Sequence, residues 1–329
     1  MTNERNTKSI TLIGVPTESG THRVGCRLGP DALRAAGLTD MLARQGHKVT
    51  DSGNLKVPHQ YQQTTTLDGR ADQVIAWAQA TQSAMKRAFR RGTVPLLLGG
   101  DHSLSVGSIA AAAHRADELN RPLFVLWLDA HPDLHSLQTT QSGNLHGTPL
   151  AHALGLENYA GRSALGRRAV PPEQICLVGA RDIDAAERTV LAAQPIQRLD
   201  LAEIAAHGVT ASLRPFLDRV THRNGMLHVS LDTDFLSPQL APAVGTPVAG
   251  GADIGVATAV MDTLARHDRV TSLDIVELNP FLDLRSRTAT LLLNLTARLF
   301  AGADSGPPPN SRAAEHQQVP QRPYIGECR

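Results

Sequence analysis

The amino-acid sequence predicts an α/β protein: a single domain in which a central, mostly parallel sheet is covered by helices on both faces. Two observations predict this fold. Short apolar runs rich in β-branched residues, typical of buried parallel strands, recur at residues 10–14, 94–98, 123–128, 175–179, 226–231 and 271–276. Stretches with helical character lie between them, at residues 31–44, 71–90, 105–120, 149–155 and 257–267. Such alternation is typical of parallel sheets with helical crossovers.

Polar residues follow directly after five of these apolar runs. In chain order, the runs VPLLL, LFVLWL, ICLV, MLHVSL and SLDIV are followed by GGDHS, DAHPD, GARDIDAAE, DTD and ELNP. Ligands of open α/β sheets bind beyond the carboxyl ends of the strands. We therefore expect the five acid-rich or histidine-bearing segments to converge on one edge of the sheet.

Composition narrows the class of partner. The chain has 329 residues, of which 41% are hydrophobic and 19% charged, enough for a large core. The formal net charge is +1, with acids and bases interspersed, which argues against nucleic acid or an anionic membrane as the main partner and favours a small molecule. The polar start MTNERNTKSI and the lack of a run approaching ~20 apolar residues predict a cytoplasmic protein.

The composition of the chain changes near its carboxyl end. It becomes rich in Pro, Gly and polar residues from Ala301 onward, so we expect one catalytic domain over residues 1–300 and an irregular or disordered tail over residues 301–329. The three cysteines, Cys26, Cys176 and Cys328, are odd in number and widely separated, which predicts free thiols rather than disulfides or zinc ligands.

The acids and histidines near the predicted strand ends point to a metal centre. In an extended segment alternate residues share a face, roughly 6.5 Å apart. Two segments therefore each present a group of side chains on one face: Asp129, His131, Asp133 and His135 in the first, and Asp232 and Asp234 in the second. We expect His102 to join these two groups. Unpaired, buried carboxylates cost several kcal/mol each, and bound cations remove that cost. Oxygen-rich ligation with a few imidazoles suits Mn²⁺ better than structural zinc. Six ligands exceed the need of one four-coordinate ion, which favours two metals with bridging carboxylates.

Each segment alone has a structural alternative. GGDHS could form a turn in which Asp101 or Ser103 caps a helix. DAHPD could be a hydrogen-bonded loop, and DTD could be a solvated surface. Their joint occurrence, each directly after an apolar strand, favours the metal centre. His228 shares the strand parity of Asp232, and we expect it to be a hydrogen-bonded core residue beneath the site.

With these motifs the chain resembles the ureohydrolases and, within them, the arginases. The resemblance rests on GVPTESG, GCRLGPDALRAAGL, GGDHSL, DAHPDLH, SGNLHG, VGARDIDAAE, SLDTDFLSPQLAPAVGTPVAGG and SLDIVELNP, and covers about the first 300 residues. It implies a three-layer α/β/α fold with two Mn²⁺ ions per subunit. One ion would be held by His102, Asp129, Asp133 and Asp232, and the other by Asp129, His131, Asp232 and Asp234. The family assembles as trimers or hexamers, so a homotrimer or homohexamer is implied.

The resemblance also implies the substrate contacts. His146 in SGNLHG matches the proton-shuttling histidine, Glu277 in ELNP the glutamate that binds the guanidinium, and Thr246 a residue lining the same pocket. The far end of the substrate would meet four further residues: Ser142 and Asn144, whose neutral donors fit a carboxylate, and Asp184 and Glu187, whose acids fit an ammonium. Taken alone, Glu277 could instead be a surface acid that caps a turn, and His146 an ordinary loop histidine.

One residue departs from the pattern of the family. Two residues after DAHPD, arginases usually have an asparagine that contacts the substrate carboxylate, whereas this chain has His135. Imidazole can also donate to a carboxylate, although His135 could equally be structural. The resemblance therefore implies an arginase that hydrolyses L-arginine to L-ornithine and urea through a hydroxide bridging two Mn²⁺ ions. The alternatives are another ureohydrolase, such as an agmatinase or guanidinobutyrase, and a non-catalytic scaffold.

Overall fold

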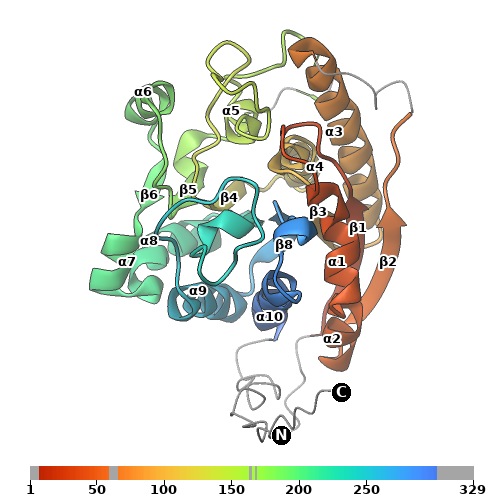
Figure 1. The fold of residues 1–329 in the computed structure, drawn as a ribbon. Coiled ribbons are helices and arrows are strands. Elements are labelled where there is room, and N and C mark those ends of the chain that lie inside the picture. The colour runs from red at the N-terminus through yellow and green to blue at the C-terminus, as the bar shows by residue number, and fades with distance from the viewer. Residues whose placement is uncertain (1–6, 59–65, 163–164, 167–168, 302–329) are drawn as a thin grey trace, which may run out of the picture.

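The structure of the protein, a computed structural model, describes residues 7–58, 66–162, 165–166 and 169–301. In this part of the chain one eight-stranded sheet has the order β2-β1-β3-β8-β7-β4-β5-β6, and every neighbouring pair is parallel (Figure 1). The strands are β1 Ser9–Val15, β2 Lys48–Asn54, β3 Val94–Gly99, β4 Leu123–Leu128, β5 Ile175–Val178, β6 Gln197–Leu199, β7 Met226–Asp232 and β8 Val270–Val276.

Helices connect the strands and cover both faces of the sheet (Figure 1). They are α1 Gly29–Ala35, α2 Leu38–Arg44, α3 Leu67–Arg90, α4 Ser105–Glu118, α5 Pro149–Ala153, α6 Ala185–Ala193, α7 Leu201–His207, α8 Val209–His222, α9 Ile254–His267 and α10 Arg287–Phe300. Two 3-10 turns matter for the site, η3 His102–Leu104 and η5 Thr233–Phe235. Among the described residues, no helix is both long and apolar enough to cross a membrane.

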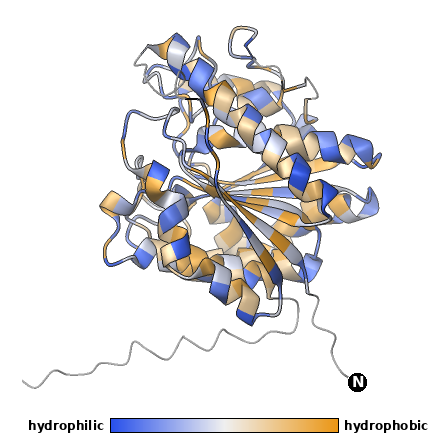
Figure 2. Cartoon of the chain, turned by 90° about the vertical axis from the view of Figure 1, so that its right-hand side faces the viewer, coloured by the Kyte–Doolittle hydropathy of each residue, from blue (hydrophilic) through white to orange (hydrophobic). Residues whose placement is uncertain are grey.

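Two apolar clusters fill the space between the layers. On β4, Phe124, Leu126 and Leu128 point into the cluster shared with α8, α9 and α10, whereas Leu123, Val125 and Trp127 point into the cluster shared with α3 and α4. Because alternate residues of a strand face opposite sides, a strand that is apolar throughout is buried on both faces. Figure 2 shows the apolar residues gathered along the strands and on the helix faces turned toward them.

The predicted fold class is confirmed, and the six predicted strands lie within one or two residues of the observed bounds. The two edge strands, β2 and β6, were not predicted because they lack an apolar run: six of the seven residues of β2 are exposed. The single helix expected at residues 31–44 was wrong. It is two helices, α1 and α2, since Gly37 between them has the left-handed conformation, with φ of 95°.

The arrangement of the central strands positions the site. β3, β8, β7 and β4 are consecutive neighbours in the sheet, so their carboxyl ends lie side by side. The chain leaves β3 through Gly100, where a Cβ atom would lie 1.8 Å from the carbonyl oxygen of Thr17. Only glycine permits so close an approach of the two loops. Cys26 and Cys176 are buried free thiols, as predicted, while Cys328 and the expected tail after Ala301 lie outside the described residues.

Candidate metal and substrate site

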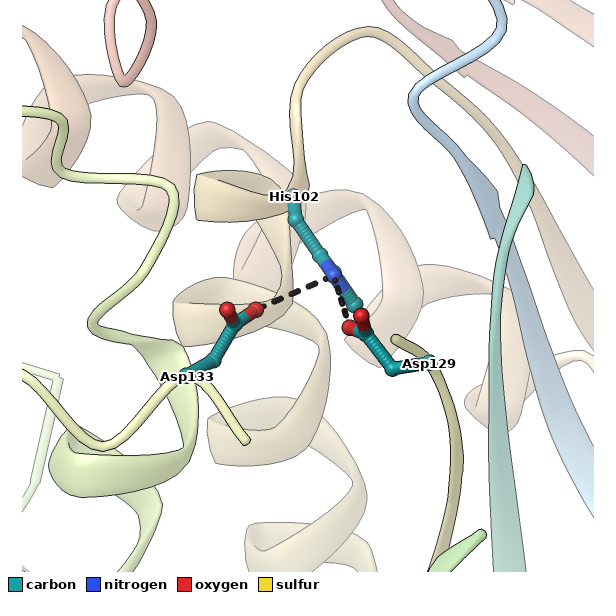
Figure 3. Close-up of side chains that lie close together, drawn as sticks. All are labelled: His102, Asp129 and Asp133. Atoms are coloured by element: carbon teal, nitrogen blue, oxygen red, sulfur yellow. Dashed lines mark ion pairs between the residues drawn. The ribbon is translucent and has the colours of Figure 1, made fainter. Parts of the chain in front are cut away.

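Three carboxylate oxygens converge on one nitrogen of His102, which begins the turn after β3. His102 is 1% exposed, and its Nδ1 lies 3.1 Å from Asp129 Oδ2, 3.1 Å from Asp133 Oδ2 and 3.0 Å from Asp232 Oδ2. Figure 3 shows His102, Asp129 and Asp133 pointing toward a common centre. His102 Nδ1 and the Oδ2 atoms of Asp129 and Asp133 are buried without a hydrogen-bond partner in the described structure.

A second group of donors adjoins the first and shares a residue with it. His131 Nδ1 lies 3.0 Å from Asp234 Oδ2 and 3.6 Å from Asp129 Oδ1. Within each triplet, His102–Asp129–Asp133 and Asp129–His131–Asp234, the donor atoms lie within 4.8 Å of one another. Asp129 belongs to both triplets, so its two oxygens face two different groups of ligand atoms.

Local turns place these side chains, not a continued strand. β4 ends at Leu128, and Asp133 has a left-handed backbone with φ of 52°, so the prediction that residues 129–135 share one extended face was wrong. Asp129 Oδ1 instead accepts from His131 N at 2.7 Å, so the chain turns directly after the end of β4. Asp232 caps η5 in a similar way, since its Oδ1 accepts from Asp234 N at 2.8 Å.

The buried charges of the two triplets are unbalanced. Burial and neighbouring carboxylates raise the pKa of Asp232 well above its ordinary value, and raise the pKa of Asp133 to about 7. Burial and Asp129 also raise the pKa of Asp234. Burial would lower the pKa of His131, but its contacts with Asp129 and Asp234 raise it to about 12. Together with Asp232, which also contacts His102, the two triplets hold four buried acids against two imidazoles, an excess of negative charge that a cation would offset.

The donor set fits the metals that the resemblance implies. Carboxylate oxygens and imidazole nitrogens, without sulfur, are ligands preferred by hard and borderline divalent cations. The orphaned Nδ1 and Oδ2 atoms lie where a cation would satisfy all of them at once. The same residues would be costly to bury without one.

Glu277 and His146 form a pair next to the first triplet. Glu277, which follows β8, is 3% exposed, and its Oε1 accepts from His102 N at 2.8 Å and lies 2.7 Å from His146 Nδ1. Burial would lower the pKa of His146, but Glu277 raises it to about 9. The alternative in which Glu277 is a surface acid is therefore wrong, because the side chain is enclosed within the site.

A cavity of about 260 Å³ opens over these groups. Its walls include metal-site and substrate-site residues predicted from the sequence: His102, His131, Asp133, His135, Ser142, Asn144, His146, Glu187, Asp232, Asp234 and Thr246. Thr246 Oγ1 donates to Asp234 Oδ2 at 3.4 Å. The structure thus brings together side chains from segments far apart in the sequence, around one opening at the carboxyl edge of the sheet.

A family profile described as "Arginase family" matches residues 8–302. The chain belongs to the arginase family. It is 45% identical over 291 residues to the arginase of Brucella melitensis, which covers 88% of this chain and 95% of that protein. The resemblance inferred from the sequence motifs is therefore confirmed.

Solved structures of the arginase family have the same fold. The structure titled arginase from Bacillus caldovelox superimposes with a TM-score of 0.82 and 33% identity, covering 89% of this chain and 98% of that one. An Entamoeba histolytica arginase in complex with L-ornithine gives a TM-score of 0.80 at 25% identity, covering 89% and 99% of the two chains.

The residue that departs from the arginase pattern contacts acids in this chain. His135 Nε2 lies 3.1 Å from Asp184 Oδ2 and 3.9 Å from Glu187 Oε1. Asp184 and Glu187 also close the amino end of α6 by a reciprocal capping box. His135 therefore faces these two acids rather than the metal triplets. Ser142 and Asn144 also line the cavity, and Asn144 N donates to Ser142 Oγ at 3.2 Å.

Several supporting residues were not predicted. Trp127 stacks on His102 with ring centroids 4.2 Å apart and planes 5° apart, and Ser230 Oγ lies 2.8 Å from His102 Nε2. Strand parity could have indicated Ser230, which lies two residues before Asp232 on the same face of β7. As expected, His228 is buried beneath the site, and its Nδ1 lies 2.8 Å from Ser272 Oγ.

Proposed function

We propose that this chain hydrolyses the guanidino group of L-arginine to L-ornithine and urea, with two Mn²⁺ ions per subunit. The observation that carries the proposal is the pair of buried donor triplets that share Asp129, beside the His146–Glu277 pair. Membership of the arginase family supports it, as do the relatives named arginase and the ornithine complex of the Entamoeba protein.

The proposed ligands divide between two ions. His102, Asp129, Asp133 and Asp232 would hold one ion, and Asp129, His131, Asp232 and Asp234 the other, so that Asp129 and Asp232 would be shared. When bound, two such cations lower the pKa of a water molecule enough to supply hydroxide near neutral pH. Trp127 and Ser230 keep the ring of His102 in place from its face and its Nε2 edge.

His146 and Glu277 act on the guanidinium. The Glu277 carboxylate would attract the cationic group from beside His146, and Thr246 lines the cavity. After oxygen adds to the guanidinium carbon, the bond from that carbon to the side-chain nitrogen of ornithine breaks. That nitrogen takes a proton from the His146 imidazolium, which Glu277 keeps protonated by its contact with Nδ1, and leaves as an amine. The hydroxyl proton of the adduct passes to solvent as the urea carbonyl forms.

The other end of the substrate would contact the outer wall of the cavity. Ser142 and Asn144 offer neutral donors for the α-carboxylate, and His135 offers a ring nitrogen. Asp184 and Glu187 offer acids for the α-ammonium. A site built to pair these groups rejects an analogue that lacks them, because its own polar atoms would then be left unsatisfied.

A substrate panel tests the proposal. Steady-state rates of urea release with Mn²⁺ would be measured for L-arginine, agmatine and 4-guanidinobutyrate, together with the metal content of the chain. We expect two ions per chain and the highest kcat/KM for L-arginine. The contact of His135 with Asp184 favours a second candidate, a guanidinobutyrase-like activity, because one ammonium-binding acid is already engaged and 4-guanidinobutyrate carries no ammonium. A higher kcat/KM for 4-guanidinobutyrate would establish that candidate, and a higher value for agmatine would establish an agmatinase instead.

The same preparation tests the assembly and the cofactor. We propose assembly into a homotrimer or homohexamer and residence in the cytoplasm, as the resemblance to ureohydrolases favours. Sedimentation equilibrium would distinguish three copies from six, and a mass corresponding to one copy would contradict both. Urea release in the absence of any bound divalent metal would contradict the proposed cofactor.

A further inference from the structure

A closed ring of contacts joins the first donor triplet to His146. On one side, His102 N donates to Glu277 Oε1 at 2.8 Å, and the same oxygen lies 2.7 Å from His146 Nδ1. On the other side, His146 N donates to Gly20 O at 3.0 Å, and Gly20 N donates to Asp101 Oδ2 at 2.7 Å. Asp101 directly precedes His102, so the backbone closes the ring.

Asp101 is a buried acid without a place in the proposed chemistry. It is 0% exposed, yet it belongs to neither donor triplet. Its carboxylate accepts from Gly20 N, from Ser103 N at 2.9 Å and from the hydroxyl of Ser103. Three donors from two segments satisfy the carboxylate, which offsets the cost of burying it and fixes its orientation.

Gly20 transmits this contact to the loop that carries His146. Its carbonyl oxygen accepts from both Leu145 N at 2.6 Å and His146 N at 3.0 Å. A Cβ atom on Gly20 would lie 2.8 Å from Asp101 Oδ1 and 2.8 Å from His146 N, so no other residue fits between them. The position of the His146 backbone is therefore tied to the position of the Asp101 carboxylate.

We propose that Asp101 is a positioning residue of the hydrolysis: acting through Gly20, it fixes the His146 imidazole relative to Glu277 and the His102 turn. This inference depends on the proposed role of His146 in proton transfer. Displacement of a catalytic group by about 1 Å can cost on the order of 10²-fold in rate. Asp101 would fix the position of His146 without itself contacting substrate or metal.

The main test is Asp101→Asn in the full-length protein loaded with Mn²⁺. The amide has nearly the same shape but only one acceptor oxygen, so it cannot accept from both Gly20 and Ser103. We expect kcat for L-arginine to fall by roughly 10- to 100-fold, with KM and bound Mn²⁺ close to those of the parent protein. Added imidazole should then raise kcat of the variant, because a diffusing acid replaces the displaced His146.

Two further variants separate positioning from general stability. Ser103→Ala removes one of the three donors to Asp101 but leaves the Gly20 contact, so its kcat should stay near the parent value and should not respond to imidazole. Gly20→Ala breaks the same contact from the other side and should reproduce the low kcat and the imidazole response. If the Asp101→Asn protein does not fold, Gly20→Ala replaces it in the same measurements.

Each remaining outcome has one meaning. An Asp101→Asn protein with unchanged kcat would overturn the inference. So would a loss of activity that tracks lost metal or lost folded protein and does not respond to imidazole, because that would show a merely structural role. A parent protein that released no urea from L-arginine would overturn the proposed function itself, before any variant is compared.

Discussion

The protein buries two groups of histidine and aspartate side chains, and they differ in charge balance. In the first group, the donor triplets together with Asp232, four acids face two imidazoles. In the second group, beneath the site between β7, β8 and α4, Asp274 faces one imidazole: its Oδ2 lies 3.2 Å from His228 Nε2. Asp274 Oδ2 also accepts from Ser105 Oγ at 2.7 Å and from the hydroxyl of Ser108, although Oδ1 has no partner among the residues that the structure describes.

The net pKa shifts of Asp274 and Asp232 have opposite signs, although burial raises both pKa values. His228 and the two serine hydroxyls hold the pKa of Asp274 below its ordinary value despite its burial. Burial and neighbouring carboxylates raise the pKa of Asp232, beside the triplets. A buried His–Asp contact is therefore not by itself a sign of function. The unpaired excess of acid is what distinguishes the site.

The largest contrast should come from the conservative change Asp232→Asn. With Mn²⁺ present, we expect kcat to fall on the order of 10³-fold or more, beyond the 10- to 100-fold typical of residues that only support ligands. In the metal-free protein the same change should raise the unfolding temperature, because it removes one of several repelling charges. Urea-release assays and thermal unfolding measure the two effects. A metal-free variant less stable than its parent would contradict the charge argument.

The dependence of stability on pH should have opposite signs in the two groups of the metal-free protein. Asp133 has a pKa raised to about 7 from an ordinary 3.8. Between these values the unfolded chain loses the proton first, so this contribution to stability falls as pH rises. Asp274 has a lowered pKa, so its contribution is present above pH 3.8 and is lost as pH falls through the folded value.

Urea unfolding of chelated protein across pH 3–7 would measure both contributions. We expect Asp133→Asn to flatten the loss of stability with rising pH and Asp274→Asn to flatten the loss at the acidic end. If both changes altered the same limb of the profile, the two groups would not differ in the way the contacts indicate.

A change at Asp274 should affect folding rather than catalysis. Asp274→Asn leaves His228 buried without a charged partner, and breaking a buried pair in this way costs about 3 kcal/mol or more. Equilibrium unfolding in urea measures the free energy. The kcat per folded molecule should be unchanged, and a selective fall in kcat would give this second group a part in the reaction.

The smallest effects should come from two serines that support the histidines. Ser272→Ala removes the partner of His228 Nδ1 and should cost about 1 kcal/mol of stability. Ser230→Ala removes the partner of His102 Nε2 and should instead weaken metal binding by roughly 10- to 100-fold. Calorimetric titration with Mn²⁺ and urea unfolding would be applied to both variants. Weaker metal binding in Ser272→Ala, or unchanged metal binding in Ser230→Ala, would contradict this assignment.

The sequence predicts the centre of this fold better than its edges. Apolar runs mark β4 and β7 because both faces of these strands are buried. The exposed edge strand β2 carries no such run, and it is defined by its pairing with β1. One continuous helix was predicted across Gly37 because a single glycine within a helical pattern does not always end a helix. Here Gly37 takes the left-handed conformation and separates α1 from α2.

For the site, the sequence identified the side chains but not how they meet. Alternation suggested that Asp129 and Asp133 share a strand face, whereas a left-handed turn at Asp133 brings them together. The contacts through Gly20 link positions more than 80 residues apart, as the separation of 81 between Gly20 and Asp101 shows. Nothing local marks such a contact, because it arises only when the loops after β1 and β3 pack against each other.

The stacking of Trp127 on His102 gives the protein an optical reporter. The chain has two tryptophans, and the other, Trp77, lies on α3. Indole emission depends on electron transfer to an adjacent imidazole and is quenched by nearby paramagnetic ions. Loading with Mn²⁺ should therefore dim the fluorescence of a Trp77→Phe protein in step with binding, so that occupancy could be followed in real time without a substrate.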